Sequence, residues 1–453
     1  PPTMARGGAG TMPSPASSDP APPTGPLRSA RAPWVAADHG ADPVEWLVTW
    51  AETPEPGPGD DGARLVWAGP AEAAPREVVA AAAEPGVGRD AVRVTGPLLD
   101  HHVHGGAGVD LATSPVGDVA AWLERGRRAG VGTVIGSLPA LPAADLASAL
   151  DRLRPLWEEG SLAGVHLEGP FLSPARSGAH DRAALCTPAS DAGHAVRAAL
   201  RGRPRGLVRT MTLAPELAGS AALERELAAA GTVPCLGHTD ADLLAARAAL
   251  DRWEALRRRT ERSGGRAPRP VVTHLFNAMR GFHHREPGPL PLLLDAARRG
   301  RLRLELIADD VHVSHHLVDL LLGDPALAPA VCLVSDAVAA TGAAPGTRHR
   351  LGPRTIHAGH DAPRLGRTPA STGAEEAPLA GGRQSLADSV AALLRRGLDP
   401  DAVLRAATHV PRESLGAEAC DGDDPARAGL VVWGPAGTRT VLVRTPTRVT
   451  PAG

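Results

Sequence analysis

Short apolar runs alternate along most of the chain with longer segments in which apolar side chains recur at helical spacing. The short runs are typical of buried strands and the longer segments of amphipathic helices, so the alternation predicts repeated β-α units around a parallel sheet. Eight strands are expected: one that ends near His102, and the ranges 131–137, 162–168, 207–213, 232–238, 271–275, 303–308 and 331–336. Eight such strands with helices between them predict an α/β fold, the TIM-like (β/α)8 barrel.

The two ends of the chain differ from this pattern. Residues 1–43 are dominated by Pro, Ala, Ser and Gly, with too few large apolar side chains to offset the entropy of ordering, which predicts a disordered tail. Short strand-like runs follow within 44–95 and return within 425–453. We expect these two stretches to pair into one small β-sandwich beside a barrel of residues 96–424.

The overall composition narrows the classes of function. A formal net charge of −2 gives no basic surface for nucleic acid, so nucleic-acid binding is not expected. No apolar run approaches the roughly 20 residues of a membrane helix, and the N-terminus lacks a hydrophobic signal core, so we expect no membrane contact and a cytoplasmic protein. The four cysteines are scattered without a CxxC pair, which argues against a disulfide framework or a zinc ribbon.

Polar side chains stand at the ends of the predicted strands, which form the active face of an eight-stranded α/β barrel. They are His102, His104, Glu168, His238, His274 and Asp336. The spacing of two puts His102 and His104 on the same side of an extended segment, where both imidazoles reach one metal ion. Residues far apart in the sequence are therefore expected to meet around a metal.

Glu168, His238 and His274 supply a His₂Glu set that suits Zn²⁺ or Fe²⁺ and leaves one position open to water. Asp336 can accept a proton from the attacking water and later donate it to a leaving nitrogen. Each residue alone has a simpler explanation, such as a loop histidine, an ion-pair partner or a helix cap. The set is more specific than its members and predicts a hydrolytic metalloenzyme.

All 48 basic side chains are arginine, because the chain contains no lysine. This excludes Schiff-base chemistry, a P-loop lysine and a carbamylated-lysine bridge between metals. Any bridge between two metal ions must therefore be a carboxylate, and Glu168 is the candidate.

Taken together, the segments HLEGPF, GHTDAD, THLFNAM, REPG, IAD-VH and SDA follow one another in an order that is hard to obtain by chance. In this order they resemble the N-acetylglucosamine-6-phosphate deacetylase family of the amidohydrolase superfamily. The resemblance covers roughly residues 44–445. It implies a metal-dependent hydrolase barrel that cleaves the acetamide of N-acetylglucosamine 6-phosphate to glucosamine 6-phosphate and acetate.

Carried over by position, the resemblance implies that Glu168, His238 and His274 bind the catalytic metal and that Asp336 is the acid/base. The residues that it places against the sugar phosphate are Ala179, His180, Asn277, Ala278, Arg285, His312, Leu379, Ala380 and Gly381. It implies one divalent ion, zinc or iron, per subunit of a homodimer. Some relatives lack the HxH pair, and because this chain keeps it, a second ion has room to bind.

Three positions depart from the family pattern: Ser177, Asp310 and the segment 379–384, which lacks the usual Ser and Thr. These departures leave substrate preference open. The alternatives are a related amidohydrolase acting on N-acetylgalactosamine 6-phosphate or an N-acyl amino acid, and a non-catalytic barrel that serves as a scaffold. Two polar insertions, near 257–268 and 357–378, are expected to be surface loops.

Overall fold

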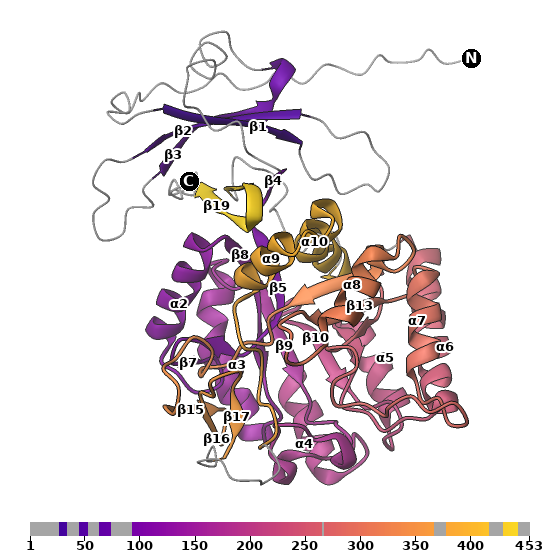
Figure 1. Ribbon diagram of the computed structural model, residues 1–453. Coiled ribbons are helices and arrows are strands. Elements are labelled where there is room, and N and C mark those ends of the chain that lie inside the picture. Colours follow the sequence, from indigo (N-terminus) through magenta and orange to yellow (C-terminus); the bar gives the residue numbers. More distant parts are fainter. Residues whose placement is uncertain are drawn as a thin grey trace, which may run out of the picture.

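The computed structural model describes residues 27–33, 45–52, 63–73, 93–264, 267–366, 377–415 and 429–442. Eight parallel strands form its central sheet (Figure 1). In sheet order they are β14 (Val331–Val334), β13 (Arg303–Ile307), β12 (Val271–Val272), β11 (Val233–Leu236), β10 (Val208–Leu213), β9 (Gly164–Glu168), β8 (Val131–Leu138) and β5 (Leu98–Val103). All eight predicted strands are present in the expected order, and the barrel prediction is confirmed.

The first and last strands meet, so the sheet is nearly closed. The backbone N–H of Asp336, just after β14, donates to the carbonyl of His102 in β5 over 2.9 Å. The Asp100 carboxylate accepts hydrogen bonds from the Ser335 hydroxyl at 2.5 Å and from the Ser335 backbone N–H at 3.1 Å. These bonds hold the two edges together at the carboxyl ends of the strands.

Helices follow the strands and pack their apolar faces on the outside of the sheet. Among the described residues, the first seven are α2 (Val116–Arg128), α3 (Ala143–Glu158), α4 (Asp191–Leu200), α5 (Ser220–Ala230), α6 (Leu243–Arg262), α7 (Leu290–Arg298) and α8 (His315–Gly323). Three more close the barrel: α9 (Leu386–Arg395), α10 (Pro400–Ala407) and α11 (His409–Leu415). None of the described helices is both long enough and apolar enough to cross a membrane.

The first polar insertion is only partly a loop, so that prediction is wrong for its beginning. Helix α6 continues to Arg262, because Arg257 pairs with Glu254 and Glu261 at helical spacing on the solvent side. In the second insertion, β16 (Arg354–His357) pairs with β15 (Arg348–Leu351) and with β17 (Arg364–Leu365) in a small antiparallel sheet. Residues 367–376 of that insertion lie outside the described residues.

Both ends of the chain contribute to two further three-stranded sheets. One consists of β1 (Leu27–Pro33), β2 (Glu45–Glu52) and β3 (Ala63–Pro70), and the other of β19 (Arg439–Leu442), β18 (Leu430–Trp433) and β4 (Arg93–Thr95). Strand β1 contacts β4, and β3 contacts β19, so the two sheets face each other (Figure 1). The antiparallel pairing of β4 with β18 joins the two chain ends, as the predicted β-sandwich requires.

The predicted disordered tail over 1–43 is wrong for residues 27–33. Strand β1 pairs along its whole length with β2, and Ala30 is buried. Backbone pairing depends little on composition, so a segment poor in large apolar side chains still joins a sheet when a partner strand is available. The remainder of 1–43 lies outside the described residues.

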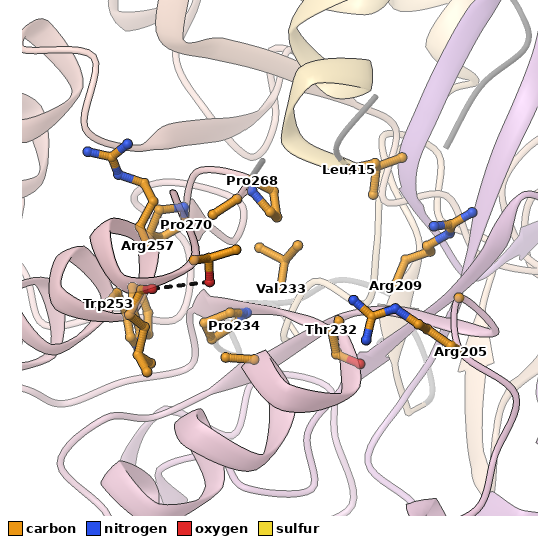
Figure 2. A pocket seen from close by; sticks show the side chains of 16 residues that line it. Arg205, Arg209, Thr232, Val233, Pro234, Trp253, Arg257, Pro268, Pro270 and Leu415 are labelled. Atoms are coloured by element: carbon orange, nitrogen blue, oxygen red, sulfur yellow. Dashed lines mark hydrogen bonds between the residues drawn. The ribbon is translucent and has the colours of Figure 1, made fainter. Parts of the chain in front are cut away.

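A cavity of about 590 Å³ opens at the amino ends of the middle strands (Figure 2). Thr232 just before β11, Val233 at its start and Pro270 just before β12 line it. The carboxyl ends of the same strands carry the predicted site residues, so this cavity is remote from them.

We expect Trp433→Ala to lower the free energy of unfolding by about 3–5 kcal/mol. Trp433 is fully buried, packs in the main core, and donates its indole N–H to the Thr95 hydroxyl over 3.0 Å. Denaturant unfolding measures the change. Trp433→Phe, which keeps most of the buried area, should cost clearly less, and a loss below about 1 kcal/mol in the alanine variant would contradict this role.

Candidate metal centre

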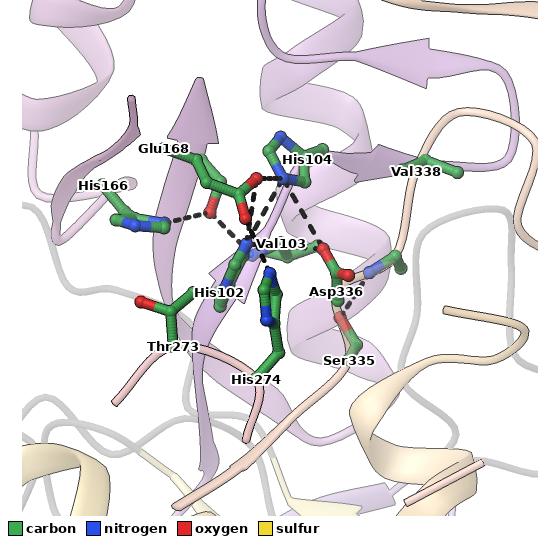
Figure 3. Close-up of polar contacts among 12 residues, drawn as sticks. His102, Val103, His104, His166, Glu168, Thr273, His274, Ser335, Asp336 and Val338 are labelled. Carbon is green, nitrogen blue, oxygen red and sulfur yellow. Dashed lines mark hydrogen bonds and ion pairs between the residues drawn. The ribbon is translucent and has the colours of Figure 1, made fainter. Parts of the chain in front are cut away.

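The side chains predicted to bind metal lie at the carboxyl ends of the barrel strands. Figure 3 shows His102, His104, Glu168 and His274 together with Asp336. Glu168 ends β9, while His238, His274 and Asp336 each lie two residues beyond the end of their strand. His102 is in β5, and His104 lies one residue after it. The barrel therefore brings together residues that span most of its sequence.

The Glu168 carboxylate is the centre of this cluster and is only 3% exposed. Its Oε1 lies 3.0 Å from His238 Nε2 and 2.9 Å from His274 Nε2. Its Oε2 lies 2.9 Å from His104 Nε2, 3.2 Å from His180 Nε2 and 3.6 Å from His102 Nε2. Each oxygen therefore faces a different group of imidazoles.

Among the described residues, two sets of side chains could each hold a metal ion. One is Glu168 with His238 and His274, and the other is His102 and His104 with Asp336. Asp336 Oδ1 lies 3.4 Å from His102 Nε2 and 3.6 Å from His104 Nε2. Because Glu168 Oε2 also lies 2.9 Å from His104 Nε2, its carboxylate contacts both sets.

The ring protonation of His238 shows that this donor set fits a cation. Its Nδ1 lies 2.7 Å from the carbonyl oxygen of Arg176, which can only accept, so Nδ1 carries the proton. In a neutral ring, Nε2 then directs a lone pair at the Glu168 carboxylate and at His274 Nε2, 3.1 Å away. Lone pairs at such distances repel unless a cation lies between them. Imidazole and carboxylate ligands in this number suit Zn²⁺ or Fe²⁺.

His180 presents the opposite ring atom to the same carboxylate. The backbone N–H of Ala140 donates to His180 Nδ1 over 3.1 Å, so in the neutral ring the proton is on Nε2. Burial lowers the pKa of His180, and this favours the neutral form. His180 therefore faces the centre as a hydrogen-bond donor, whereas His238 faces it as a ligand.

The backbone is strained at the residues that face the centre. His238, His274 and Asp336 have φ values of 48°, 29° and 47°, in the left-handed region that residues with a Cβ seldom occupy. Such conformations cost about 1–3 kcal/mol each and persist where surrounding contacts impose them. Here the strained turns direct the two imidazoles and the carboxylate back over the ends of their strands.

The Glu168 carboxylate is kept ionised by its neighbours. Burial alone would raise the pKa of Glu168, but the positive charge that His180, His102 and His238 carry when doubly protonated outweighs burial and lowers it. Among the described residues, the ion-pair partners of this carboxylate are all histidines. A positive charge at the centre therefore comes from protons or from a bound metal.

Several residues expected to touch a substrate lie around the centre. Ala179 packs against an apolar cluster that includes Ala380, so the loop after β9 meets the segment 379–381. Gly178, at φ 53°, lies so close to the His238 ring that a Cβ would come within 2.9 Å of it, and Ala278 lies next to the same position.

The segment that contains Leu379 and Gly381 runs along the backbone of Asp336. At Gly381, with φ 124°, a Cβ would come within 2.8 Å of the Asp336 carbonyl oxygen, so this close approach needs glycine. The N–H of Gly382 donates to the same carbonyl over 2.7 Å. The Asn277 amide N–H₂ donates to the carbonyls of His274 and Leu275 at 3.2 and 3.3 Å.

His312 is oriented by Asp309, which sequence reasoning did not assign. The His312 Nδ1–H donates to the Asp309 carboxylate over 2.9 Å, and the backbone N–H groups of His312 and Arg383 donate to the same side chain. Burial alone would raise the pKa of Asp309, but these contacts lower it to about 2. Asp309 and His312 are three residues apart in the sequence, a spacing at which a carboxylate can accept hydrogen bonds from a residue of the same turn.

Arg285 lies in the exposed loop between β12 and α7. Its backbone N–H donates to His283 Nδ1 over 3.4 Å, and among the described residues its side chain makes no hydrogen bond or ion pair with the metal-type residues.

Asp240 links the loops around the centre and was also missed. It pairs with Arg176 at 2.8 Å, in the loop after β9, and with Arg280 at 2.8 Å, in the loop after β12. Because the Arg176 carbonyl accepts from His238, this ion-pair group helps to fix the orientation of that imidazole. Asp240 belongs to the GHTDAD segment, but nothing in that segment indicates that it pairs with Arg176 and Arg280.

The chain is similar to amino-sugar deacetylases in sequence and in fold, although no family model matches it. It is 36% identical over 268 residues to N-acetylglucosamine-6-phosphate deacetylase of Bos taurus, which covers 57% of this chain and 60% of that protein. It is 30% identical over 258 residues to N-acetylgalactosamine-6-phosphate deacetylase of Escherichia coli O157:H7, covering 56% and 62%. These alignments thus span less than two thirds of the curated relatives' length.

In three dimensions the likeness extends over nearly the whole chain. A structure of a mutant N-acetyl-D-glucosamine-6-phosphate deacetylase from Mycobacterium smegmatis, in complex with N-acetyl-D-glucosamine-6-phosphate, matches with a TM-score of 0.68 at 28% identity. The match covers 92% of this chain and 98% of that one.

We expect Glu168→Gln to lose most of its bound divalent metal, because an amide cannot replace a carboxylate that faces both sets of imidazoles. Elemental analysis of metal-loaded, desalted protein measures the loss. Glu224→Gln is the matched control, since Glu224 is equally buried but pairs with Arg252 outside the barrel. Normal metal content in Glu168→Gln would show that the metal lies elsewhere.

Proposed function

We propose that this chain, which is similar in sequence and fold to N-acetylglucosamine-6-phosphate deacetylases of the amidohydrolase superfamily, hydrolyses the acetamide of N-acetylglucosamine 6-phosphate. The products are glucosamine 6-phosphate and acetate. The observation that carries the proposal is the Glu168 carboxylate, faced on both oxygens by imidazoles, with Asp336 beside the same cluster.

The chain's own residues supply proton transfer and hydrogen bonding. A divalent metal at this centre, when bound, polarises the amide carbonyl and makes the attacking water more acidic. Asp336 accepts the proton of that water as the new C–O bond forms. It then donates the proton to the amide nitrogen as the C–N bond breaks, so the amine leaves uncharged and the carboxylate is regenerated.

Two histidines are placed to stabilise the charge that develops on the carbonyl oxygen. His180 offers an Nε2–H toward the centre, as the hydrogen bond from Ala140 to its other nitrogen requires. His312 is held by Asp309; burial lowers its pKa, but the hydrogen bond to Asp309 and the Asp309 charge outweigh burial and raise it. A donor fixed in advance strengthens as the oxygen becomes negative, and this is the condition for lowering the barrier.

We propose zinc or iron as the metal, with one ion held by Glu168, His238 and His274. The His102, His104 and Asp336 set supports a second ion, because it offers three further ligand atoms within reach of one position. Histidine and carboxylate ligands favour these metals over Mg²⁺ or Ca²⁺, which prefer oxygen ligands alone.

Arg285 is proposed to bind the substrate phosphate, and the protein is proposed to act as a cytoplasmic homodimer. Phe282, in the same loop as Arg285, is 64% exposed. An exposed aromatic side chain is the kind of surface that a subunit interface covers. This supports an arrangement in which one subunit offers its Arg285 to the partner's site.

Acetate release from three substrates tests the proposal. We expect turnover of N-acetylglucosamine 6-phosphate well above that of N-acetylgalactosamine 6-phosphate or an N-acetyl amino acid. Faster turnover of the galactose epimer would favour N-acetylgalactosamine-6-phosphate deacetylase activity, the activity named for one of the relatives. No acetate from any of the three by metal-loaded protein would favour the non-catalytic scaffold.

We expect Asp336→Asn to fold and to keep metal at Glu168, His238 and His274 while kcat falls steeply. Asparagine has nearly the same size but cannot cycle a proton. General acid/base catalysis is worth about 10²- to 10⁴-fold, and a residue that serves two transfers should lie near the upper end. Steady-state kinetics with matched metal analysis measures the effect. A kcat within about tenfold of the parent would assign the proton transfer to another group.

Arg285→Ala should mainly raise KM, because the phosphate is remote from the amide and its binding is shared by ground and transition states. Losing a charge-assisted hydrogen bond of about 1.5–3 kcal/mol weakens binding about 10- to 150-fold. Arg299→Ala is the control, since Arg299 pairs with Asp295 at the exposed end of α7. Equal KM values for the parent and Arg285→Ala would remove this residue from the substrate site.

A further inference from the structure

Glu305 is another carboxylate buried in the barrel, and none of the predicted functions uses it. It lies in the middle of β13 and is 1% exposed. Its Oε1 lies 2.8 Å from His101 Nδ1, and its Oε2 lies 2.9 Å from His102 Nδ1. Oε2 also accepts the backbone N–H of His274 over 3.3 Å. One side chain therefore contacts residues from both metal-type sets.

The local backbone allows two adjacent histidines to reach the same carboxylate. In a regular strand, neighbouring side chains point to opposite faces. The pairing of β5 with β8 is irregular between Asp100 and Val103, and an irregularity of this kind turns an extra side chain to one face. His101 and His102 thereby both approach Glu305, which lies two strands away in the sheet.

The contact with Glu305 determines which nitrogen of His102 faces the centre. An ionised carboxylate only accepts, so the proton of the neutral ring must be on Nδ1. Nε2 then carries a lone pair, and it points to His104 Nε2 at 3.3 Å and to Asp336 Oδ1 at 3.4 Å. Without Glu305, no described acceptor would fix the proton on Nδ1, and either ring nitrogen could hold it.

We propose that Glu305 is the positioning residue of the His102, His104 and Asp336 half of the centre: it fixes His102 as a metal ligand and enables that half to hold an ion. The inference rests on the proposed metal-dependent function. It adds to that function the residue that decides whether His102 and His104 bind a metal ion. Ligand histidines commonly need such a partner, and its loss typically costs about 10- to 100-fold in metal affinity.

The surroundings of Glu305 are consistent with this role. Its side chain is 1% exposed, and its two oxygens lie 2.8 and 2.9 Å from the Nδ1 atoms of His101 and His102. Its ion-pair partners among the described residues are histidines. Glu168 is a further buried carboxylate, facing the other ring nitrogen of His102, and a bound cation offsets the charge of both.

The test is a double-mutant cycle in metal affinity on the full chain. Parent, Glu305→Leu, His102→Ala and the double variant are loaded with Zn²⁺ and titrated with a chelator, and the most weakly held ion is followed. We expect each single variant to weaken it about 10- to 100-fold. The double variant should be no more than about threefold weaker than His102→Ala, because Glu305 acts through that ring.

Two further variants separate positioning from a general loss of stability. Glu305→Gln has the same shape and keeps one oxygen that accepts from His102, so its metal affinity should lie between those of the parent and Glu305→Leu. Glu224→Leu removes an equally buried carboxylate that pairs with Arg252. It should lower the unfolding temperature without changing metal affinity.

Three results would overturn the proposal. Glu305→Leu could bind metal as tightly as the parent, or His102→Ala could do so. In the third, the loss of affinity in the double variant would equal the product of the losses in the two single variants. If Glu305→Leu does not fold, the affinities of Glu305→Gln and of Glu305→Gln with His102→Ala decide by the same comparison. The chelator titration needs no substrate. If the metal affinities agree with the expected cycle but the protein releases no acetate, only the proposed reaction is refuted. If the protein releases acetate but the two substitutions act independently on metal affinity, only the positioning role of Glu305 is refuted.

Discussion

A carboxylate buried among imidazoles is the constraint on which the site depends. Glu168 is nearly inaccessible to water, and no arginine is among its ion-pair partners in the described part of the chain. An ionised carboxylate in such surroundings costs several kcal/mol unless positive charge is placed against it. The imidazoles supply that charge only by holding protons or by sharing a cation with the carboxylate. Removing one member of the cluster therefore leaves buried charge without a partner and destabilises the protein.

Hydrogen bonds behind the imidazoles divide them into ligands and donors. His102 and His238 each give their Nδ1 proton to an oxygen, of Glu305 and of the Arg176 backbone, so both direct Nε2 lone pairs inward. His180 accepts at Nδ1 from Ala140 and so directs a proton inward. Rings that look equivalent in the sequence thus have opposite roles, and each role is set by one bond outside the centre.

The loops keep this arrangement in place at the cost of backbone strain. His238, His274 and Asp336 occupy left-handed conformations just beyond the strand ends. The closure of β14 on β5 through Ser335 and Asp100 holds the last of these turns, and Asp240 clamps the loops after β9 and β12. The barrel thus serves as a rigid ring from which short, strained turns project ligands inward.

The sequence by itself determined the barrel and the residues that face its carboxyl end. Strand and helix periods are local properties of the sequence. Polar residues at the ends of apolar runs, such as Glu168 and His274, can therefore be recognised without knowing which residues they contact. Strand β1 escaped notice because its order comes from pairing with β2 rather than from its own composition.

Only the tertiary structure decided which nitrogen each histidine presents and which residues lie behind the ligands. Glu305 could have been noticed as a charged residue inside a buried strand, but its partners His101 and His102 are about two hundred positions away. Asp240 and Asp309 likewise acquire their roles from the groups they contact in space. Spacing along the chain specifies the face on which a side chain lies, whereas a hydrogen bond forms between atoms that only folding brings within about 3 Å of each other.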